Sequence, residues 1–312
     1  MIEGLSGRGI FVFSDPGGAK PLLSLINKVE AGLSDFRIIS DRKYSFYDDF
    51  NLKVENIRKS PLSTLREFSA DFVFTGTSYT STIELQYLEA AAQLSIYSYS
   101  FVDHWTFIRE RFLYNNTEIL PNEIFVVDNE AREGALAQGL PGEIVKVLGN
   151  PYHEYLESWY PTKTRKDLLI SLGLNFTNKR IIVYAPDPLS NINGISLYGF
   201  DEVLATKWLN NLSESLSDEY LLIVKPHPNQ NIELLKNILN EKSILVSSNV
   251  DVNTLIFYSD TVIGFFSSFL IEASIMDKSV VRLLPRDVMN DPFANKSIGR
   301  IAYPDTISSL FN

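Results

Sequence analysis

Residues 222–229 read Leu-Ile-Val-Lys-Pro-His-Pro-Asn, and residues 260–273 read Asp-Thr-Val-Ile-Gly-Phe-Phe-Ser-Ser-Phe-Leu-Ile-Glu-Ala. Each stretch starts as an apolar strand and then turns to basic, polar or small side chains. In an open parallel sheet the carboxyl ends of the strands meet at one edge, and ligands bind there. The side chains that this pattern predicts at one common edge are Lys225, His227, Ser267 and Ser268.

The chemistry of these side chains favours a phosphate or diphosphate ligand. Lys225 supplies a cation and His227 an imidazole, while Ser267 and Ser268 stand at the expected start of a helix, whose N-terminus attracts anions. The prolines on both sides of the imidazole fix φ and hold the turn stiffly. A structural interpretation stays open for each element: a rigid turn for the first, and a simple N-cap for the paired serines.

Two further residues accompany this edge. Glu272 follows one turn into the expected helix, where its carboxylate either binds the ribose hydroxyls of a nucleotide or is a solvated first-turn charge. Pro186 belongs to the stretch Ala185–Pro188, which ends another expected strand. That stretch reads equally well as part of a ligand site and as a proline-stiffened turn.

Composition excludes several kinds of site and leaves room for two domains. The chain has 312 residues, of which 45% are hydrophobic, and a length near 300 favours about two domains. There is no cysteine, so disulfides and thiolate metal sites are excluded, and three histidines leave little room for a histidine metal cluster. A net charge of −10 disfavours non-specific nucleic-acid binding, which needs basic surface.

The sequence shows no membrane-spanning or secretory segment. No apolar run approaches the roughly 20 residues that a bilayer span needs, and the start, residues 1–9, has no apolar signal-peptide core. We therefore expect a cytoplasmic protein without a transmembrane segment. Peripheral membrane contact and the oligomeric state are left open.

Short apolar strands alternate with helices along the chain, which predicts βαβ units and parallel sheets. Gly149-Asn150-Pro151 punctuates the middle, so we expect two Rossmann-like, doubly wound α/β domains, 1–150 and 151–312. The longest stretch expected to be irregular is 186–199. Strands are expected at 9–13, 36–40, 71–75, 94–102, 123–127, 144–148, 180–184, 221–224, 243–246, 261–263 and 280–284. Helices are expected at 22–29, 61–68, 80–93, 129–138, 155–160, 163–172, 201–216, 232–240, 254–258 and 268–276.

Two loops that follow strands in the first half are candidates for contact with a sugar or an acceptor. Residues 14–18, Ser-Asp-Pro-Gly-Gly, enter a helix but lack the spacing of a dinucleotide or P-loop fingerprint. Adjacent glycines permit close approach of a ligand. The hydroxyl groups of the second loop, residues 75–78 (Thr-Gly-Thr-Ser), suit a sugar. The first loop reads almost equally as a tight turn, and the second loop reads equally as a helix cap. The candidate residues are Gly17, Gly18, Thr75, Gly76 and Thr77.

Asp103 and His104 follow the strand expected at 94–102. A carboxylate suits the general base that removes a proton from a hydroxyl, and an imidazole suits the same role nearer neutral pH. The structural alternative is an Asp–His hydrogen bond that holds a loop. Arg109 and Arg111, a few residues on, suit either anionic ligand groups or surface ion pairs.

These motifs and the two-domain pattern resemble the GT-B glycosyltransferases, and among them bacterial enzymes of surface-polysaccharide assembly: sialyl- and Kdo-transferases and CDP-glycerol glycerophosphotransferases. Residues 225–228 resemble the His-Pro motif, and residues 266–268 with Glu272 resemble the paired-Ser motif, that such enzymes use on donor nucleotide phosphates. Residues 148–151 are similar to the domain junction of GT-B proteins, including UDP-N-acetylglucosamine 2-epimerases. The resemblance implies two domains facing across a cleft, with the acceptor on the first and the nucleotide donor on the second.

The function that the resemblance implies is an inverting, metal-independent glycosyltransferase. It would use a CMP-sugar or NDP-sugar donor and a glycan acceptor in capsule or lipopolysaccharide biosynthesis, without a cofactor. Asp103, His104 or, third, Asp15 would be the base. No Asp-x-Asp metal motif occurs in the chain, so side chains and backbone N–H groups must meet the charge of the leaving group. Two alternatives stay open: a nucleotide-sugar 2-epimerase on the same scaffold, and a non-catalytic nucleotide- or sugar-binding protein.

Overall fold

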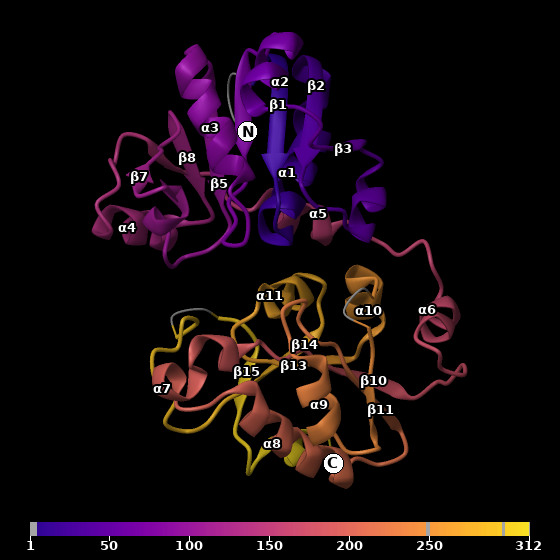
Figure 1. Ribbon diagram of the computed structural model, residues 1–312. Coiled ribbons are helices and arrows are strands. Elements are labelled where there is room, and N and C mark those ends of the chain that lie inside the picture. The colour runs from indigo at the N-terminus through magenta and orange to yellow at the C-terminus, as the bar shows by residue number, and fades with distance from the viewer. Residues whose placement is uncertain (1–4, 248–249, 295–296, 312) are drawn as a thin grey trace. The chain divides into compact units, whose positions relative to one another are not determined.

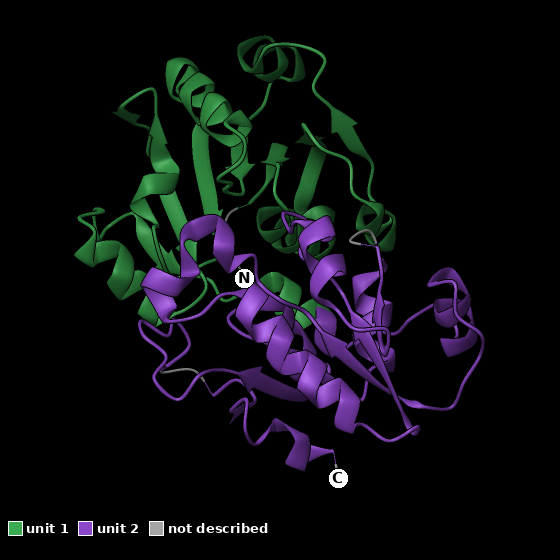
Figure 2. Ribbon diagram, turned by 60° about the horizontal axis from the view of Figure 1, so that its bottom comes forward, with its two compact units in different colours: residues 1–155 green, residues 156–312 purple. Residues whose placement is uncertain are grey.

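The computed structural model describes residues 5–247, 250–294 and 297–311 (Figure 1). Residues 1–4, on which part of the N-terminal interpretation rests, lie outside the described residues. The chain divides into two compact units, residues 1–155 (unit 1) and 156–312 (unit 2), coloured green and purple in Figure 2. Among the described residues, no helix is both long enough and apolar enough to cross a membrane.

The described part of unit 1 is built on a seven-stranded sheet whose neighbouring strands all run parallel. The chain moves outward from β1 in one direction and then crosses back to continue on its other side, so the switch point of this doubly wound sheet lies between β1 and β4. Across the sheet the strands are β3 (Val54–Asn56), β2 (Leu33–Ser40), β1 (Gly7–Phe13), β4 (Phe72–Thr75), β5 (Tyr97–Val102), β8 (Glu123–Val126) and β9 (Val145–Val147).

The central strands of unit 1 are apolar on both faces, as strands covered on both sides must be. On one face Ile10 and Val73 pack with Tyr87 of α3 in a buried cluster. The alternate residues Phe11 and Phe74 stack with ring centroids 6.0 Å apart. The helices are α1 (Pro16–Val29), α2 (Pro61–Phe68), α3 (Ile83–Leu94), α4 (Asn129–Ala137) and α5 (Pro151–Glu157), with 3₁₀ turns η1 (Glu30–Gly32), η2 (Ser45–Phe50) and η3 (Arg109–Phe112) and a hairpin of β6 (Leu113–Tyr114) and β7 (Thr117–Glu118).

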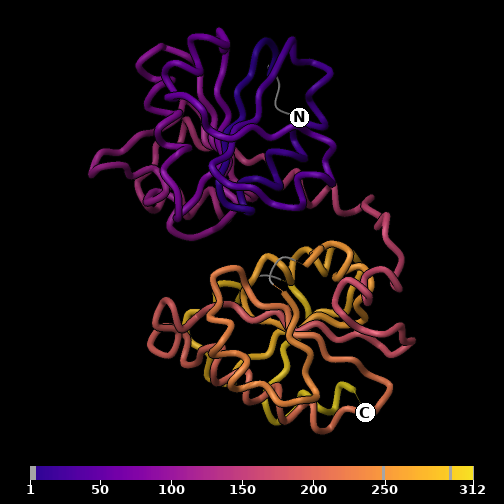
Figure 3. Tube along the Cα trace, turned by 45° about the vertical axis from the view of Figure 1, so that its right-hand side comes forward, coloured from indigo at the N-terminus to yellow at the C-terminus, as the bar shows by residue number. Residues whose placement is uncertain are grey.

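Unit 2 repeats the same arrangement in a six-stranded parallel sheet formed by its described residues. Here the switch point lies between β10 and β13. The path of the chain through this sheet can be followed by colour in Figure 3. Across the sheet the strands are β12 (Ser243–Leu245), β11 (Tyr220–Val224), β10 (Arg180–Tyr184), β13 (Thr261–Gly264), β14 (Ser279–Leu283) and β15 (Arg300–Ala302).

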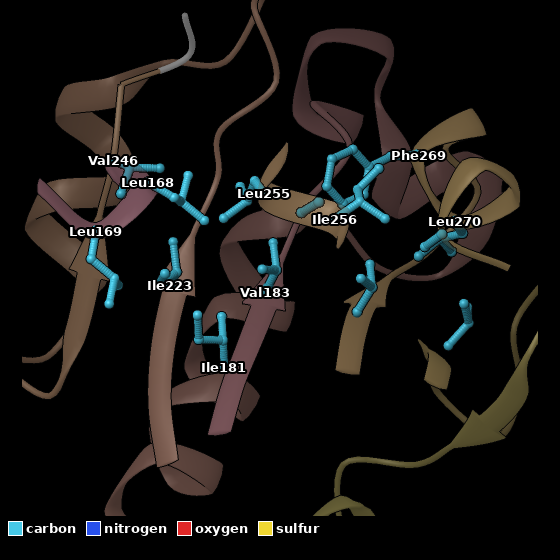
Figure 4. Close-up of a cluster of buried hydrophobic side chains, with 14 residues drawn as sticks. Leu168, Leu169, Ile181, Val183, Ile223, Val246, Leu255, Ile256, Phe269 and Leu270 are labelled. Atoms are coloured by element: carbon cyan, nitrogen blue, oxygen red, sulfur yellow. The ribbon is translucent and has the colours of Figure 1, made fainter. Parts of the chain in front are cut away.

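A buried apolar cluster packs three helices of unit 2, α6, α10 and α11, against its sheet (Figure 4). Val183 of β10 and Ile223 of β11 pack there with Leu255 of α10 and Leu270 of α11, so the start of α11 is held close to the end of β13. The helices of unit 2 are α6 (Arg165–Ser171), α7 (Gly194–Tyr198), α8 (Glu202–Ser215), α9 (Ile232–Ile238), α10 (Val252–Tyr258) and α11 (Ser268–Ile275), with 3₁₀ turns η4 (Leu189–Ile192) and η5 (Ile307–Leu310).

The fold class expected from the sequence is confirmed, because both units are α/β with doubly wound parallel sheets. Strand β10 and helix α2 have the predicted bounds, and most other elements differ by one to three residues at their ends. The hairpin strands β6 and β7 and the edge strands β3 and β15 are not predicted. The two edge strands have three residues each, of which only Ala302 of β15 is buried, and neither produces a continuous apolar run.

Two local predictions are wrong. The stretch 186–199 is not irregular, since it contains η4 and α7. Asn193 joins these two turns with φ of +57°, and a Cβ on Gly194 would lie 2.6 Å from Leu189 Cβ, so the segment is folded tightly on itself. The helix expected at 155–160 instead begins at Pro151, because a proline in the first helical turn loses no intrahelical hydrogen bond.

Candidate functional site

Three loops of unit 2 meet at the carboxyl edge of its sheet. Strand β10 pairs in parallel with β11 on one side and with β13 on the other, so the segments that follow these strands emerge together at the switch point. A hydrogen bond of 2.9 Å joins two of them directly, from the backbone N–H of Phe266 to Oδ2 of Asp187. The loops carry the predicted phosphate-site residues Lys225, His227, Ser267 and Ser268.

The imidazole of His227 is held in one protonation state. Burial, and then the charge of Lys225, lower the pKa of His227 to about 4, so the ring is neutral at pH 7. Its Nδ1 accepts the backbone N–H of Asn229 at 3.1 Å. A neutral imidazole carries one N–H, and because Nδ1 is the acceptor, the proton is on Nε2. His227 therefore provides a neutral hydrogen-bond donor.

Lys225 is buried, with 8% of the residue exposed. Its ammonium lies 5.6 Å from the ring centroid of Phe269, in the first turn of α11. The same charge acts on His227 and on Asp187, because it lowers the pKa of both groups. A cation at the end of β11 is therefore within electrostatic reach of the other two loops.

The N-terminus of α11 is capped as the sequence predicts. Ser267 is the N-cap, and its hydroxyl accepts the backbone N–H of Phe269 at 3.2 Å. Ser268 is exposed and Pro186 is buried. Glu272 is only 6% exposed, so the interpretation of Glu272 as a solvated first-turn carboxylate is wrong.

Asp187 is the residue of this edge that the sequence interpretation missed. Burial and, to a smaller extent, the carboxyl group of Glu202 raise its pKa to about 6, against the opposing effects of the Phe266 N–H, Lys225 and the Ser267 hydroxyl. One signal was available in the sequence. Asp187 is the only ionisable residue in a Pro-Asp-Pro turn that directly follows a predicted strand.

The buried side chain of Glu202 helps to hold residues 227–230 in place. Glu202, 1% exposed, accepts the backbone N–H of Ser190 at 2.8 Å and Nε2 of Gln230 at 3.0 Å. The side chain of Asn191 donates to the backbone carbonyl of Asn229 at 3.0 Å. These bonds tie residues 227–230 to η4 and to the start of α8. No local sequence signal indicated this support.

In unit 1 the loops after β1, β4 and β5 also emerge at one edge, since these strands are parallel neighbours. A Cβ on Gly76 would lie 2.9 Å from Cα of Gly18. The two glycines therefore permit close packing of one loop on the other. This contact explains why glycine is needed at positions 18 and 76 without a ligand. Gly17 contacts a different residue.

Gly17 lies against the carboxylate of Asp103, whose Oδ2 would overlap a Cβ at position 17. Oδ1 of Asp103 pairs with Nη1 of Arg111 at 3.1 Å, and the same nitrogen donates to Oγ1 of Thr77 at 3.0 Å. Arg111 also lies beneath the ring of Tyr79, 4.4 Å from its centroid. With 8% of the residue exposed, Arg111 does not form the surface ion pair that is the alternative in the sequence interpretation.

Other candidates of unit 1 have different surroundings. Asp15 pairs with Arg42 at 3.3 Å and accepts hydrogen bonds from Thr80 Oγ1 and the Tyr79 N–H, so its carboxylate is already engaged. Thr75 is fully buried, and its hydroxyl lies 2.6 Å from that of Ser100 within the sheet. The Thr75 hydroxyl is therefore engaged inside the sheet and is not available to a ligand.

His104 is oriented by its own loop. Its Nδ1 contacts the backbone N–H and hydroxyl of Thr106 at 3.2 and 3.0 Å. Burial lowers the pKa of His104, which favours the neutral ring. Asp103 makes its ion pair with Arg111, so an Asp–His hydrogen bond does not hold this loop. Arg109, by contrast, forms an exposed ion pair with Glu118 at 2.6 Å.

A second buried carboxyl group, that of Glu84, contacts the loop that follows β1. Glu84 is 3% exposed and accepts the backbone N–H of Ser14 at 2.9 Å and the hydroxyl of Ser78 at 3.0 Å. Burial raises the pKa of Glu84 to about 7. The group joins the loops after β1 and β4, and the sequence interpretation did not single it out. Across the described parts of both units, no group of three His, Asp or Glu residues is arranged to hold a metal ion.

Comparison with known proteins gives a family match for part of the chain. Residues 148–285, somewhat under half of the chain, match the family model described as CDP-Glycerol:Poly(glycerophosphate) glycerophosphotransferase. The matched segment contains β10, β11 and β13 and all three loops at the edge of the unit 2 sheet. No curated protein matches the chain.

Solved structures share the fold over nearly the whole length. A putative UDP-N-acetylglucosamine 2-epimerase from Listeria monocytogenes is similar with a TM-score of 0.70 and 14% identity over 97% of this chain and 86% of that chain. S. aureus MnaA in complex with UDP is similar with a TM-score of 0.66 and 15% identity over 97% of this chain and 86% of that chain. For UDP-GlcNAc 2-epimerase from Neisseria meningitidis bound to UDP-GlcNAc, the TM-score is 0.64 and the identity is 16%, over 97% of this chain and 90% of that chain. At such identities the likeness shows the GT-B-type fold alone.

Proposed function

We propose that this protein is an inverting, metal-independent transferase. It moves a sugar from a nucleotide-activated donor to a hydroxyl group of a glycan acceptor, in cytoplasmic steps of surface-polysaccharide assembly. The observation that carries the proposal is the meeting of three loops at the switch point of unit 2. The match of residues 148–285 to a glycerophosphotransferase family supports a transferase that uses a nucleotide-activated donor.

The donor phosphates are assigned to unit 2. Lys225 supplies a buried positive charge, His227 supplies its Nε2–H, and the N-terminus of α11 supplies backbone N–H groups with the positive end of the helix dipole. Groups fixed in this way stabilise the negative charge that develops on the leaving phosphate without having to reorganise. Glu272 and Pro186 are assigned to the nucleoside side of the same site.

Activation of the acceptor is assigned to Asp103 of unit 1. The carboxylate is oriented by Arg111 and Gly17 and keeps 23% of its side chain exposed. As the acceptor oxygen bonds to the anomeric carbon, the bond from that carbon to the phosphate oxygen breaks and the nucleotide leaves with the electron pair. Asp103 takes the acceptor proton. A single displacement of this kind inverts the anomeric centre. The neutral ring of His104 is the alternative base.

Ligand-dependent thermal unfolding tests the donor assignment. CMP, CDP, UDP, GDP, their sugars and CDP-glycerol are compared at equal concentration, and the cognate nucleotide raises the melting temperature because it binds only the folded state; at a hundred times Kd the gain is about 2.7 kcal/mol. If none of these nucleotides stabilises the protein, the proposal is wrong. Product analysis then identifies the bond broken, since glycosyl transfer from an NDP-sugar releases NDP whereas glycerophosphate transfer from CDP-glycerol releases CMP.

A nucleotide-sugar 2-epimerase is the second candidate, because the structures that share the fold over 97% of this chain include UDP-GlcNAc 2-epimerases. Incubation with UDP-GlcNAc in the absence of any acceptor separates the two activities. An epimerase converts or hydrolyses the donor under these conditions, whereas the transferase leaves it essentially unchanged until an acceptor is added. Binding without turnover under either condition indicates a non-catalytic binding protein.

A further inference from the structure

The proposed phosphate site contains a carboxyl group where an anion is expected. Oδ2 of Asp187 accepts the backbone N–H of Phe266, which directly precedes the N-cap Ser267. The Ser267 hydroxyl also stabilises the Asp187 carboxylate. A phosphate at the N-terminus of α11 therefore approaches the Asp187 carboxylate, and two negative charges at one site disfavour each other.

The charged groups around Asp187 do not remove this conflict. Lys225 contributes one positive charge, and His227 is neutral at pH 7. The carboxyl group of Glu202 acts on Asp187 in the unfavourable direction. The titratable groups that face Asp187 are Tyr184 of β10, Tyr198 of α7, Glu202 of α8 and Lys225 at the end of β11.

We propose that Asp187 takes up one proton from solvent when the donor phosphate binds, and that its neutral carboxyl group then takes part in binding. This inference rests on the proposed function, because it requires a phosphate at the N-terminus of α11. Uptake of the proton removes the like-charge repulsion. It also frees the Ser267 hydroxyl, which no longer needs to donate to a carboxylate and can donate to a phosphate oxygen. The proton returns to solvent when the nucleotide leaves.

Burial already favours the protonated form of Asp187 before a nucleotide binds. Burial raises the pKa of Asp187 to about 6, so about a tenth of the molecules carry the proton at pH 7. Protonation before binding therefore lowers the apparent affinity only about tenfold at that pH. By linkage, a phosphate that favours the neutral carboxyl group raises the pKa of Asp187 in the complex.

Isothermal titration calorimetry in buffers of different ionisation enthalpy measures the proton uptake. The probes are CDP-glycerol and UDP-N-acetylglucosamine, because their phosphates are diesters without a proton that titrates between pH 6 and 8. CDP and UDP are avoided, since a terminal phosphate titrates near pH 6. We expect uptake to approach one proton per ligand near pH 7.5 and to vanish toward pH 5. Affinity should fall up to tenfold per pH unit above pH 6. Binding of either probe with no uptake at pH 7.5 overturns the inference but leaves the donor site intact.

Two variants identify the proton acceptor. Asp187→Asn is neutral at every pH, so it should bind without proton uptake and with an affinity that no longer falls above pH 6. His227→Gln is the matched control: it keeps an N–H donor near the site but does not titrate, so it should retain the uptake. If His227→Gln abolishes the uptake and Asp187→Asn retains it, the imidazole takes the proton and the inference is wrong. If Asp187→Asn does not fold, absence of proton uptake in the parent protein at pH 7.5 still overturns the inference. Failure of every nucleotide to bind overturns the proposed function itself.

Discussion

Nη1 of Arg111 lies 3.1 Å from Oδ1 of Asp103, while Oδ2 of the same carboxylate rests against Gly17. The guanidinium of Arg111 is almost fully buried, and its ion pair with Asp103 joins η3 to the loop after β5. Both carboxylate oxygens are thereby positioned by groups from other loops. This arrangement distinguishes Asp103 from the exposed acidic residues of unit 1.

Asp103→Asn should lower kcat by roughly 10²–10⁴-fold, because the amide keeps the shape of the carboxylate but does not accept a proton. Donor affinity should change little, since the proposed donor contacts lie in unit 2. Steady-state kinetics with the cognate donor and acceptor measure the first effect, and thermal shift measures the second. His104→Ala is the comparison: if it abolishes turnover while Asp103→Asn does not, the imidazole is the base.

Gly17→Ala should reproduce much of the loss seen in Asp103→Asn. A Cβ at this position overlaps Oδ2 of Asp103, so the carboxylate must move, and small displacements of a catalytic group are costly. Gly32→Ala is the matched control, because the nearest atom to its new methyl group is 3.7 Å away. Equal kcat values for the two variants would show that the position of Asp103 does not matter for turnover.

His227→Ala and Ser267→Ala should each weaken nucleotide binding by roughly 10–100-fold, the range expected for one hydrogen bond to a charged group. The loss in His227→Ala should be similar at pH 5.5 and pH 8, because the pKa of His227 is about 4 and the ring stays neutral over this range. Calorimetry at both pH values provides the measurement. Ser274→Ala, at an exposed position of the same helix, is the control; parent-like affinity in both site variants contradicts the phosphate-site assignment.

Activity should persist in EDTA. The chain has no Asp-x-Asp motif, and the charge of the leaving group is assigned to Lys225, His227 and the N-terminus of α11. Turnover is compared before and after chelation and after addition of Mg²⁺ or Mn²⁺. Strict dependence on an added divalent cation contradicts this assignment.

Glu84 should make the free energy of unfolding depend on pH. Its pKa is raised by burial to about 7 in the folded protein, above the value in the unfolded chain, so the folded state binds the proton more tightly. Its contribution to stability is therefore fully present below about pH 4.5 and is lost as pH rises toward 7, by at most about 1.4 kcal/mol per pH unit. Glu84→Gln should remove this slope. Urea unfolding of both proteins at pH 5, 6, 7 and 8 measures it, and identical slopes contradict the prediction.

Local sequence patterns were sufficient for the fold class and for part of each candidate site. Continuous apolar runs such as 180–184 mark strands buried on both faces, and Ser267 marks the start of α11 because an N-cap hydroxyl satisfies a backbone N–H two residues away. The short edge strands β3 and β15 lack such a pattern. Their pairing depends on a neighbouring strand rather than on their own residues.

Tertiary structure alone decided the protonation and the support of the sites. Asp187 meets Phe266 across 79 residues of sequence, and Glu84 meets Ser14 across 70. Arg111 is buried against Asp103 although its neighbours in sequence suggest an exposed ion pair. The sequence determines which groups exist and which strand each one follows. The pKa and orientation of a side chain depend on burial and on partners brought together by folding, so only the packed sheets could place Asp187, Glu84 and Arg111 at these sites.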